Sequence, residues 1–291
     1  MTRIGFIGLG IMGGPMAGHL AAAGHQVTGY ARRQPAADRL AEAGGTPVGS
    51  VADAVAGAEV VITMLPNHPE VEDVVLGDDG VLANAAGGLL YIDMSTIRPE
   101  TSVEIARRGA ESGVRVLDAP VSGGQAGAEN ASLSIMVGGE DADFTAARPL
   151  FDVLGGTIVH VGPHGAGQTV KAANQLVVAG IYALVSEAIV LLEASGVDAK
   201  AGLDVLAGGL AANRILDLKR ESMLARRFAP GFRIDLHDKD MGIVDAAARN
   251  AGIALPVTGL TTQLMAAARA MGLGDLDHSA LLTVIERLSG R

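Results

Sequence analysis

A glycine-rich segment near the N-terminus has the spacing of a dinucleotide-binding loop. Gly8-Leu9-Gly10-Ile11-Met12-Gly13 matches G-x-G-x-x-G, directly follows the apolar run Ile4–Ile7 and precedes a helical pattern. Gly8 would permit a tight turn, Gly10 would let the backbone approach a pyrophosphate, and Gly13 would let helix and strand pack closely. The helix N-terminus would offer backbone N–H groups to the phosphates. The segment therefore predicts dinucleotide binding, and a glycine turn in another α/β protein is the alternative.

Two arginines stand where an acid that binds ribose is usual. In NAD-binding proteins this acid lies at the end of the second strand. Here that position reads Tyr30-Ala31-Arg32-Arg33, with no acid. A guanidinium of Arg32 or Arg33 could instead bind a 2′-phosphate, and two solvated arginines on a loop are the alternative. We therefore expect NADP(H) as the favoured cofactor and leave NAD(H) open.

The first half of the chain alternates short apolar runs with helical stretches. The expected strands are 4–8, 27–30, 60–65, 89–93, 114–118, 133–137 and 157–161, and the expected helices are 12–23, 35–43, 69–76, 99–111 and 142–154. Continuous apolar strands separated by helices are typical of a parallel sheet that is covered on both faces. The pattern predicts an α/β Rossmann-type doubly wound sheet.

The pattern changes at residues 162–167, after which no convincing strand follows. A long helix is expected over 165–195, and shorter helices over 199–207, 213–226, 238–250, 256–270 and 278–288. We therefore expect a dinucleotide-binding Rossmann domain over 1–162 and an all-helical substrate and oligomerisation domain over 163–291. The apolar face of 171–192 is too long for a small domain to cover, which favours a homodimer or homotetramer.

Composition excludes several classes of protein. The 291 residues include no Cys, which excludes disulfides and thiolate chemistry. They include no Trp and have a net charge of -10, which argues against binding of nucleic acid. Asn174, Gln175 and Glu187 would be costly in lipid, so the apolar helix is interpreted as buried rather than membrane-spanning. We expect a cytoplasmic protein. Acids and a histidine crowd near residue 238, and we interpret them as residues of a helix start rather than metal ligands; they are Asp235, His237, Asp238 and Asp240.

Several ordered motifs across the whole chain resemble the β-hydroxyacid dehydrogenase family. Besides the glycine loop, they are Ile62-Thr63-Met64-Leu65-Pro66-Asn67, Ile92-Asp93-Met94-Ser95-Thr96, Asp118-Ala119-Pro120-Val121-Ser122-Gly123-Gly124, Gly165-Ala166-Gly167-Gln168 with Lys171 and Asn174, and Lys239-Asp240. The segments Asn174-Gln175, Pro230–His237 and Asp277–Ala280 look most like the tartronate semialdehyde reductase branch. The departure is Ala31, where relatives that use NAD tend to carry an acid.

The resemblance implies an architecture like that of 6-phosphogluconate dehydrogenase, with a long helix between the domains, and it implies a role for each matching residue. Lys171 is implied to be the catalytic acid/base, and Asn174 to orient the substrate. Ser122, Gly123 and Gly124 are implied to bind the substrate carboxylate, while Leu65, Thr96 and Lys239 lie beside the cofactor. An ammonium near a carbonyl can stabilise developing negative charge and donate a proton, so the role of Lys171 is chemically sound. Taken alone, a lysine at the start of an apolar helix is more often a solvated end.

The implied activity is NAD(P)-dependent interconversion of a small 3-oxo acid and its 3-hydroxy acid. The branch resemblance favours tartronate semialdehyde and glycerate as that pair, and 3-hydroxyisobutyrate dehydrogenase is the alternative within the family. A non-catalytic dinucleotide sensor is the alternative from another class, and Lys171 argues against it. Imine reductases share the fold, but by resemblance they lack this lysine.

Overall fold

The computed structural model describes every residue from Met1 to Arg291 and divides the chain into two compact units, Met1–Lys171 and Ala172–Arg291. The division falls inside helix α9 (Ala166–Ala194). The boundary expected at residue 163 lies shortly before this helix begins.

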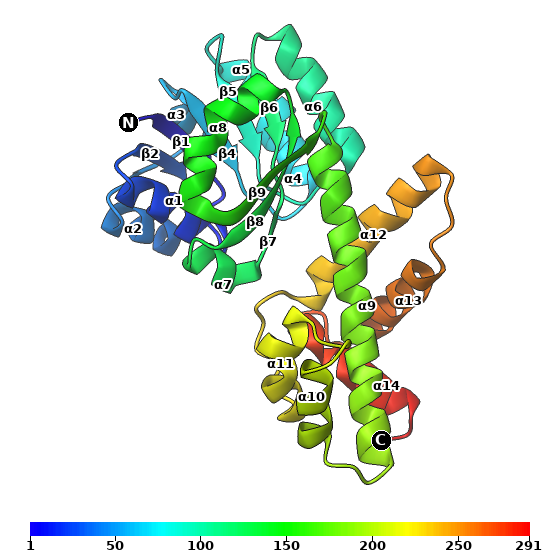
Figure 1. The fold of residues 1–291 in the computed structure, drawn as a ribbon. Coiled ribbons are helices and arrows are strands. Elements are labelled where there is room, and N and C mark those ends of the chain that lie inside the picture. The colour runs from blue at the N-terminus through cyan, green and yellow to red at the C-terminus, as the bar shows by residue number, and fades with distance from the viewer. The chain divides into compact units, whose positions relative to one another are not determined.

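The first unit is built on a nine-stranded sheet with the order β3-β2-β1-β4-β5-β6-β8-β7, and β9 pairs with β8 (Figure 1). The strands are β1 (Arg3–Ile7), β2 (Gln26–Tyr30), β3 (Thr46–Val48), β4 (Val60–Thr63), β5 (Leu90–Asp93), β6 (Arg115–Asp118), β7 (Val121–Ser122), β8 (Leu133–Gly139) and β9 (Gly155–Gly162). All neighbours from β3 to β6 pair in parallel. The doubly wound sheet is therefore confirmed.

The sheet departs from a purely parallel one at β8, which runs antiparallel to β6. The segment between these strands holds β7 and the six-residue helix α7 (Gly124–Glu129). Neither element carries the chain back to the other end of the sheet, so β8 runs in the opposite direction. Parallel pairing resumes between β8 and β9 because helix α8 (Asp141–Leu154) supplies a crossover between them.

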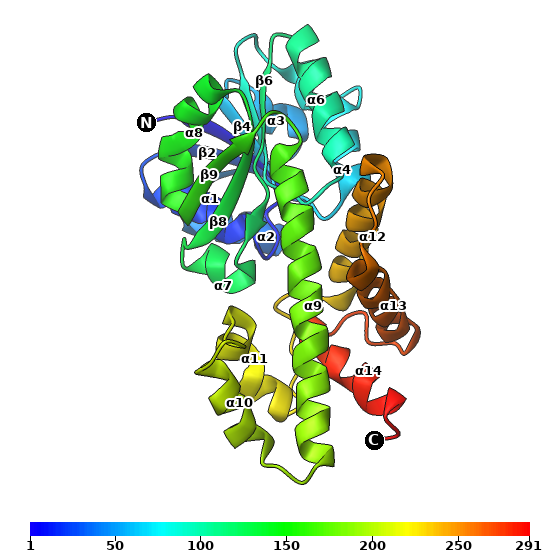
Figure 2. The same cartoon turned by 45° about the vertical axis from the view of Figure 1, so that its right-hand side comes forward.

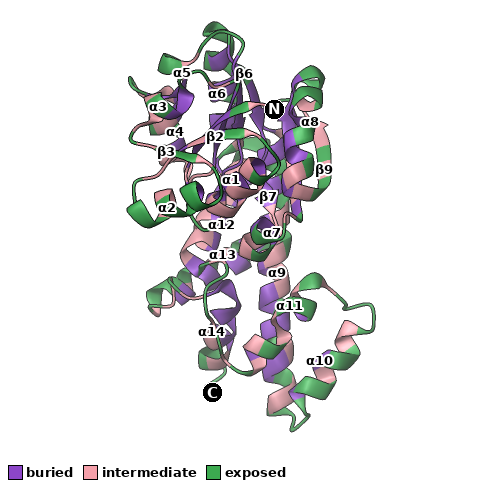
Figure 3. Ribbon diagram, turned by 90° about the vertical axis from the view of Figure 1, so that its left-hand side faces the viewer, coloured by how far each residue is buried: buried purple, intermediate pink, exposed green.

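Helices cover both faces of this sheet. One apolar cluster joins one face of the sheet to α1 (Gly13–Ala22), α2 (Gln34–Glu42), α7 and α8. A second cluster joins the other face to α3 (Val51–Val55), α4 (His68–Leu76), α5 (Val81–Asn84) and α6 (Pro99–Glu111). The strands of the sheet are largely buried, whereas the helices are buried on one side only (Figure 3). Continuous apolar strands are expected where both faces are covered.

The sequence did not predict two strands and three helices of this unit, and all five are short. Strand β3 lies at the edge of the sheet, contains Pro47 and is mostly exposed, so it lacks an apolar pattern. Strand β7 has two residues, and α3, α5 and α7 have six or fewer. Elements this short show too little periodicity to be detected.

The second unit contains only helices (Figure 2). After α9 come α10 (Ala199–Ala207), α11 (Arg214–Leu224), α12 (Ile234–Ala251), α13 (Pro256–Ala270), the short η1 (His278–Ala280) and α14 (Leu281–Leu288). A single apolar cluster takes residues from all of them. Helix α12 begins four residues earlier than residue 238, where we expected it. Its first N–H groups, of Ile234 and Asp235, donate to carbonyls of Leu276 and Gly274, partners that are distant in sequence.

Helix α9 is long and apolar enough to cross a membrane by length and composition, and 44% of its most apolar window is buried. The core helix of a soluble protein meets the same criterion. Along this helix, buried and exposed residues alternate (Figure 3).

Candidate active site

The glycine loop lies between β1 and α1, and each of its three glycines meets a different constraint. Gly8 has φ +102°, a conformation that side chains rarely adopt, and a Cβ there would overlap the carbonyl of Met64. A Cβ at Gly13 would overlap the carbonyl of Gly8, so helix and strand approach closely there. A Cβ at Gly10 would meet open space. These environments match the role expected of each glycine.

The start of α1 fits a phosphate-bearing ligand. Met12 occupies the N-cap position and makes no side-chain hydrogen bond to the helix. Its neighbour Ile11 is 64% exposed. A helix start that lacks a side-chain cap keeps N–H groups available for an anion. The open space at Gly10 adds room for a pyrophosphate beside these donors.

The strand order reverses between β1, which leads into this loop, and its neighbour β4. Ligands of doubly wound sheets bind at such switch points, beyond the carboxyl ends of the strands. Leu65 follows β4 and Thr96 follows β5, and the backbone N–H of Leu65 donates to Ser95 Oγ over 2.9 Å. The two segments that were expected beside the cofactor are therefore bonded to each other.

Arg32 and Arg33 follow Ala31 at the end of β2, the strand on the other side of β1. Both side chains are exposed, and neither forms an ion pair in the structure. Arg33 also occupies the N-cap position of α2 in an extended conformation. Both guanidinium groups are therefore available to an anionic ligand at the carboxyl end of β2.

Lys171 is buried, with 6% of its surface exposed. Its ammonium donates a hydrogen bond to the carbonyl oxygen of Val121 over 2.7 Å. Val121 immediately precedes Ser122, so the structure brings Lys171 to the Ser122–Gly124 segment. Gly123 and Gly124 have φ values of +130° and +60°, which explains glycine at both positions. A buried ammonium beside such a glycine turn is suited to a substrate that carries both a carboxylate and a carbonyl.

In the second unit, Asn174 and Lys239 are joined through two buried residues. Asn174 Nδ2 donates to Gln175 Oε1 over 2.7 Å, and Gln175 Nε2 donates to Asp240 Oδ2 over 2.6 Å. Asp240 Oδ1 lies 2.8 Å from Lys239 Nζ. The two residues expected to face substrate and cofactor are therefore linked by two hydrogen bonds and one ion pair.

Comparisons with known proteins assign this arrangement to a family. The NAD binding domain of 6-phosphogluconate dehydrogenase matches residues 3–162, and the NAD-binding domain of NADP-dependent 3-hydroxyisobutyrate dehydrogenase matches residues 165–285. The chain belongs to the β-hydroxyacid dehydrogenase family.

Relatives of this β-hydroxyacid dehydrogenase cover nearly its whole length. It is 41% identical to 2-hydroxy-3-oxopropionate reductase of Escherichia coli over 99% of this chain and 98% of that protein. It is 37% identical to NAD-dependent L-serine dehydrogenase of Pseudomonas aeruginosa, and the match covers 100% of both chains. The solved structure of 3-hydroxyisobutyrate dehydrogenase of Mycobacterium tuberculosis with L-serine is 36% identical, covers 98% of this chain and 99% of that chain, and has a TM-score of 0.88. The chain is therefore an oxidoreductase of this family.

Two buried polar residues of this β-hydroxyacid dehydrogenase were not identified from the sequence as site residues. Asp118, at the end of β6, and Gln168, in the first turn of α9, are each 1% exposed, and Asp118 Oδ2 accepts a hydrogen bond from the backbone N–H of Gln168. Burial raises the pKa of Asp118 to about 6, helped by the charge of Asp93 and opposed by N–H groups of Gly165 and Gln168. Both residues belong to motifs that carry the family resemblance, but their burial is visible only in the structure.

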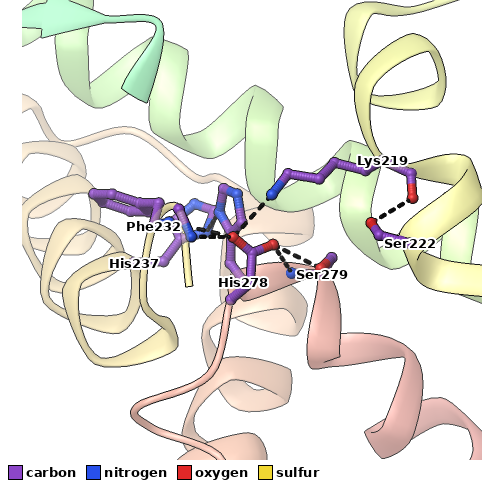
Figure 4. Close-up of polar contacts among 8 residues, drawn as sticks. Lys219, Ser222, Phe232, His237, His278 and Ser279 are labelled. Carbon is purple, nitrogen blue, oxygen red and sulfur yellow. Dashed lines mark hydrogen bonds and ion pairs between the residues drawn. The ribbon is translucent and has the colours of Figure 1, made fainter. Parts of the chain in front are cut away.

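A second buried carboxylate, Asp277, organises the start of α12, and Figure 4 shows Lys219, Phe232 and Ser279, which bond to it. It accepts hydrogen bonds from Lys219 Nζ over 2.9 Å, from the N–H groups of Gly231 and Phe232, and from Ser279. Burial alone would raise the pKa of Asp277, but His278, Ser279 and Lys219 outweigh it and lower the pKa to about 2. Asp277 also caps η1, where its side chain accepts from the N–H of Ser279. This carboxylate therefore holds the loop before α12 against η1.

The crowded acids and histidine near residue 238 each contact another side chain of the helical unit. Asp235 and Asp238 both accept from Arg269, over 2.7 and 2.8 Å. Asp240 bonds to Gln175, and His237 lies 3.1 Å from His278 between their Nδ1 atoms. These residues therefore hold α12 to α13, α9 and η1 within the helical unit.

Proposed function

We propose that this enzyme interconverts a small 3-oxo acid and its 3-hydroxy acid with a nicotinamide dinucleotide, and that Lys171 is the acid/base. The observation that carries the proposal is the buried ammonium of Lys171, 2.7 Å from the Val121 carbonyl and next to the Ser122–Gly124 turn. An ammonium that already donates to one carbonyl oxygen has the chemistry to donate to a substrate carbonyl oxygen. A non-catalytic sensor would not require a buried lysine at this point.

When bound, the cofactor would supply or accept the hydride, and the protein would bind and orient the substrate and move the proton. Gly8–Gly13 and the start of α1 would hold the pyrophosphate, with Leu65, Thr96 and Lys239 beside the rest of the cofactor. Ser122 Oγ and the N–H groups of Gly123 and Gly124 would bind the substrate carboxylate, and Asn174 would orient the substrate. In the direction of reduction, Lys171 Nζ would stabilise the negative charge that develops on the carbonyl oxygen and then protonate it.

Tartronate semialdehyde and glycerate are the substrate pair that we favour. Similarity to 2-hydroxy-3-oxopropionate reductase supports them. Similarity to 3-hydroxyisobutyrate dehydrogenase, at a TM-score of 0.88, supports methylmalonate semialdehyde as the second candidate. The two substrates differ by a 2-hydroxyl against a methyl group, and a site built to bond the hydroxyl rejects the methyl analogue strongly.

Steady-state kinetics with both semialdehydes and both reduced cofactors test this proposal. We expect the highest kcat/KM for tartronate semialdehyde with NADPH. A higher value for methylmalonate semialdehyde would move the enzyme to the other branch, and no turnover of either semialdehyde would contradict the reaction itself.

NADP(H) is the cofactor that we favour, because Ala31 stands where an acid would repel a 2′-phosphate and the exposed Arg32 beside it forms no ion pair. Similarity to an NAD-dependent L-serine dehydrogenase supports the alternative, NAD(H). We further propose that the enzyme is cytoplasmic, in keeping with the absence of cysteine.

We also propose a homodimer or homotetramer assembled on α9. Val177, Leu184 and Leu191 follow one another at seven-residue spacing and are 58%, 67% and 67% exposed. Residues seven apart lie on one face of a helix, and the small Gly180 lies on the same side between the first two. A second copy of the same chain offers an identical apolar stripe as cover.

A further inference from the structure

The first turn of α9 is held by a carboxylate from the sheet. Asp118 Oδ1 accepts a hydrogen bond from the N–H of Gly165 over 2.7 Å, and Oδ2 accepts from the N–H of Gln168 over 3.0 Å. Helix starts leave four N–H groups without a partner inside the helix. Two backbone donors at this helix start are therefore satisfied by one side chain from β6.

The side chain of Gln168 bonds the same turn to the loop after β5. Its Oε1 accepts from the N–H of Ile97 over 3.1 Å, and its Nε2 donates to the carbonyl of Ser95 over 2.9 Å. Ser95 Oγ in turn accepts from the N–H of Leu65. The segments after β4, β5 and β6 are thus connected to the start of α9 by buried hydrogen bonds.

Glycines let the helix lie directly against the sheet at this point. A Cβ at Gly167 would lie 2.8 Å from Asp118 Oδ2 and would overlap the carbonyl of Met136. A Cβ at Gly138 would lie 2.6 Å from Asp118 Oδ1 and 2.8 Å from the N–H nitrogen of Gly167. The contact leaves no space in which the first turn could shift toward the sheet.

We propose that Asp118 and Gln168 are positioning residues of the reaction, which fix Lys171 through the first turn of α9. Lys171 lies three residues after Gln168, about one turn along the same helix. A rigid helix transmits a movement of its first turn to Lys171 Nζ, and a misplacement of about 1 Å in a catalytic group can cost 10²-fold in rate. This inference rests on the proposed acid/base role of Lys171.

Asp118→Asn is the variant that tests Asp118. The amide keeps the size of the carboxylate, but its NH₂ group meets a backbone N–H donor, so one of the two bonds is lost. We expect kcat to fall about 10- to 100-fold with the dissociation constant of the cofactor almost unchanged. Hydrogen exchange at residues 165–171 should be faster than in the wild type. Gln168→Met, which removes both side-chain bonds of Gln168, should show the same two effects.

Asp143→Asn is the matched control. Asp143 is a 7% exposed carboxylate in the first turn of α8 that bonds Arg115 over 3.0 Å, away from Lys171. This variant should lose stability without a change in kcat. If Asp118→Asn and Gln168→Met behave like the control, losing only stability, the inference is wrong. If Asp118→Asn does not fold, Gln168→Met decides alone.

Lys171→Ala separates the two proposals. Wild-type turnover in Lys171→Ala would overturn the proposed function, whatever the other variants show. An inactive Lys171→Ala together with wild-type kcat and exchange in Asp118→Asn would overturn only the positioning role.

Discussion

Lys171 Nζ lies 2.7 Å from the carbonyl oxygen of Val121, a residue 50 positions earlier in the chain. This hydrogen bond joins α9 to β7, the short strand that ends at Ser122. It places a buried positive charge beside the Ser122–Gly124 turn. The acid/base and the carboxylate-binding segment that we propose are therefore neighbours before any substrate binds.

Replacement of Lys171 by Ala should reduce kcat/KM by about 10²- to 10⁴-fold, because one positioned proton donor is lost. Cofactor affinity, measured by titration calorimetry, should remain near that of the wild type. Lys200→Ala is a suitable control, since Lys200 is exposed and pairs only with Asp204 on its own helix. Turnover that persists at the wild-type level in Lys171→Ala would exclude this lysine as the acid/base.

Alanine substitutions at Gly10 and Gly13 should affect different properties, cofactor affinity at Gly10 and stability at Gly13. A Cβ at Gly10 meets open space, so Gly10→Ala should fold with a wild-type melting temperature but bind the dinucleotide at least about tenfold more weakly, a loss of 1.4 kcal/mol. A Cβ at Gly13 overlaps the carbonyl of Gly8, so Gly13→Ala should melt at a lower temperature. Equal cofactor affinity in Gly10→Ala and wild type would argue against a pyrophosphate at this loop.

Arg32→Ala should raise the KM for NADPH by about tenfold, because a charge-assisted bond to the 2′-phosphate contributes a couple of kcal/mol at best. The KM for NADH should change little, since NADH carries no such phosphate. Arg39→Ala, on the exposed side of α2, controls for the loss of a nearby positive charge. If the wild type has the higher kcat/KM with NADH, the preference for NADP is wrong.

Leu184→Glu should dissociate the oligomer. Leu184 is 67% exposed at the centre of the apolar stripe of α9, and a carboxylate there would be buried against an apolar neighbour in the assembly. Light scattering should give a multiple of 29.4 kDa for the wild type and a lower mass for the variant. Val205→Glu, at a 75% exposed residue of α10, should leave the mass unchanged. A wild-type mass near 29.4 kDa would contradict the assembly.

The charge state of Asp118 should make stability depend on pH. Its pKa in the folded protein is about 6, above its ordinary value of 3.8, so the folded state holds an extra proton between these values. This stabilisation is fully present below about pH 4 and is lost as pH rises through about 6, by roughly 3 kcal/mol in total. The groups facing Asp118 are Asp93 from β5 and the N–H groups at the start of α9. His164, on the loop before α9, is bonded to the carbonyl of Val116.

Asp118→Asn cannot titrate and should lack this contribution. Chemical denaturation of the wild type and of Asp118→Asn at several pH values between 4 and 7 gives the free energy of unfolding of each protein, and the contribution of Asp118 is the change in their difference with pH. The free energy of unfolding of Asp118→Asn, relative to that of the wild type, should increase over this interval. A difference that stays constant with pH would show that Asp118 does not titrate in this range.

The sequence alone determined the features that depend on local order. Alternating apolar strands and helices predict the doubly wound sheet, and the spacing of Gly8, Gly10 and Gly13 predicts their three separate roles. Family motifs pointed to Lys171 and the Ser122–Gly124 turn. Each of these signals is a pattern of neighbouring residues, which exists before the chain folds.

Only the tertiary structure decided which polar side chains are buried together. Asp118 and Gly165 lie 47 residues apart, and Gln168 and Ser95 lie 73 apart, yet each pair is hydrogen-bonded inside the protein. Likewise, Asp277 holds the loop before α12 across 46 residues. Local periodicity indicates that a strand ends at Asp118, but not that a helix start will meet it there. That meeting depends on the order of strands in the sheet and on glycines that admit close contact, so it is fixed only when the whole chain packs.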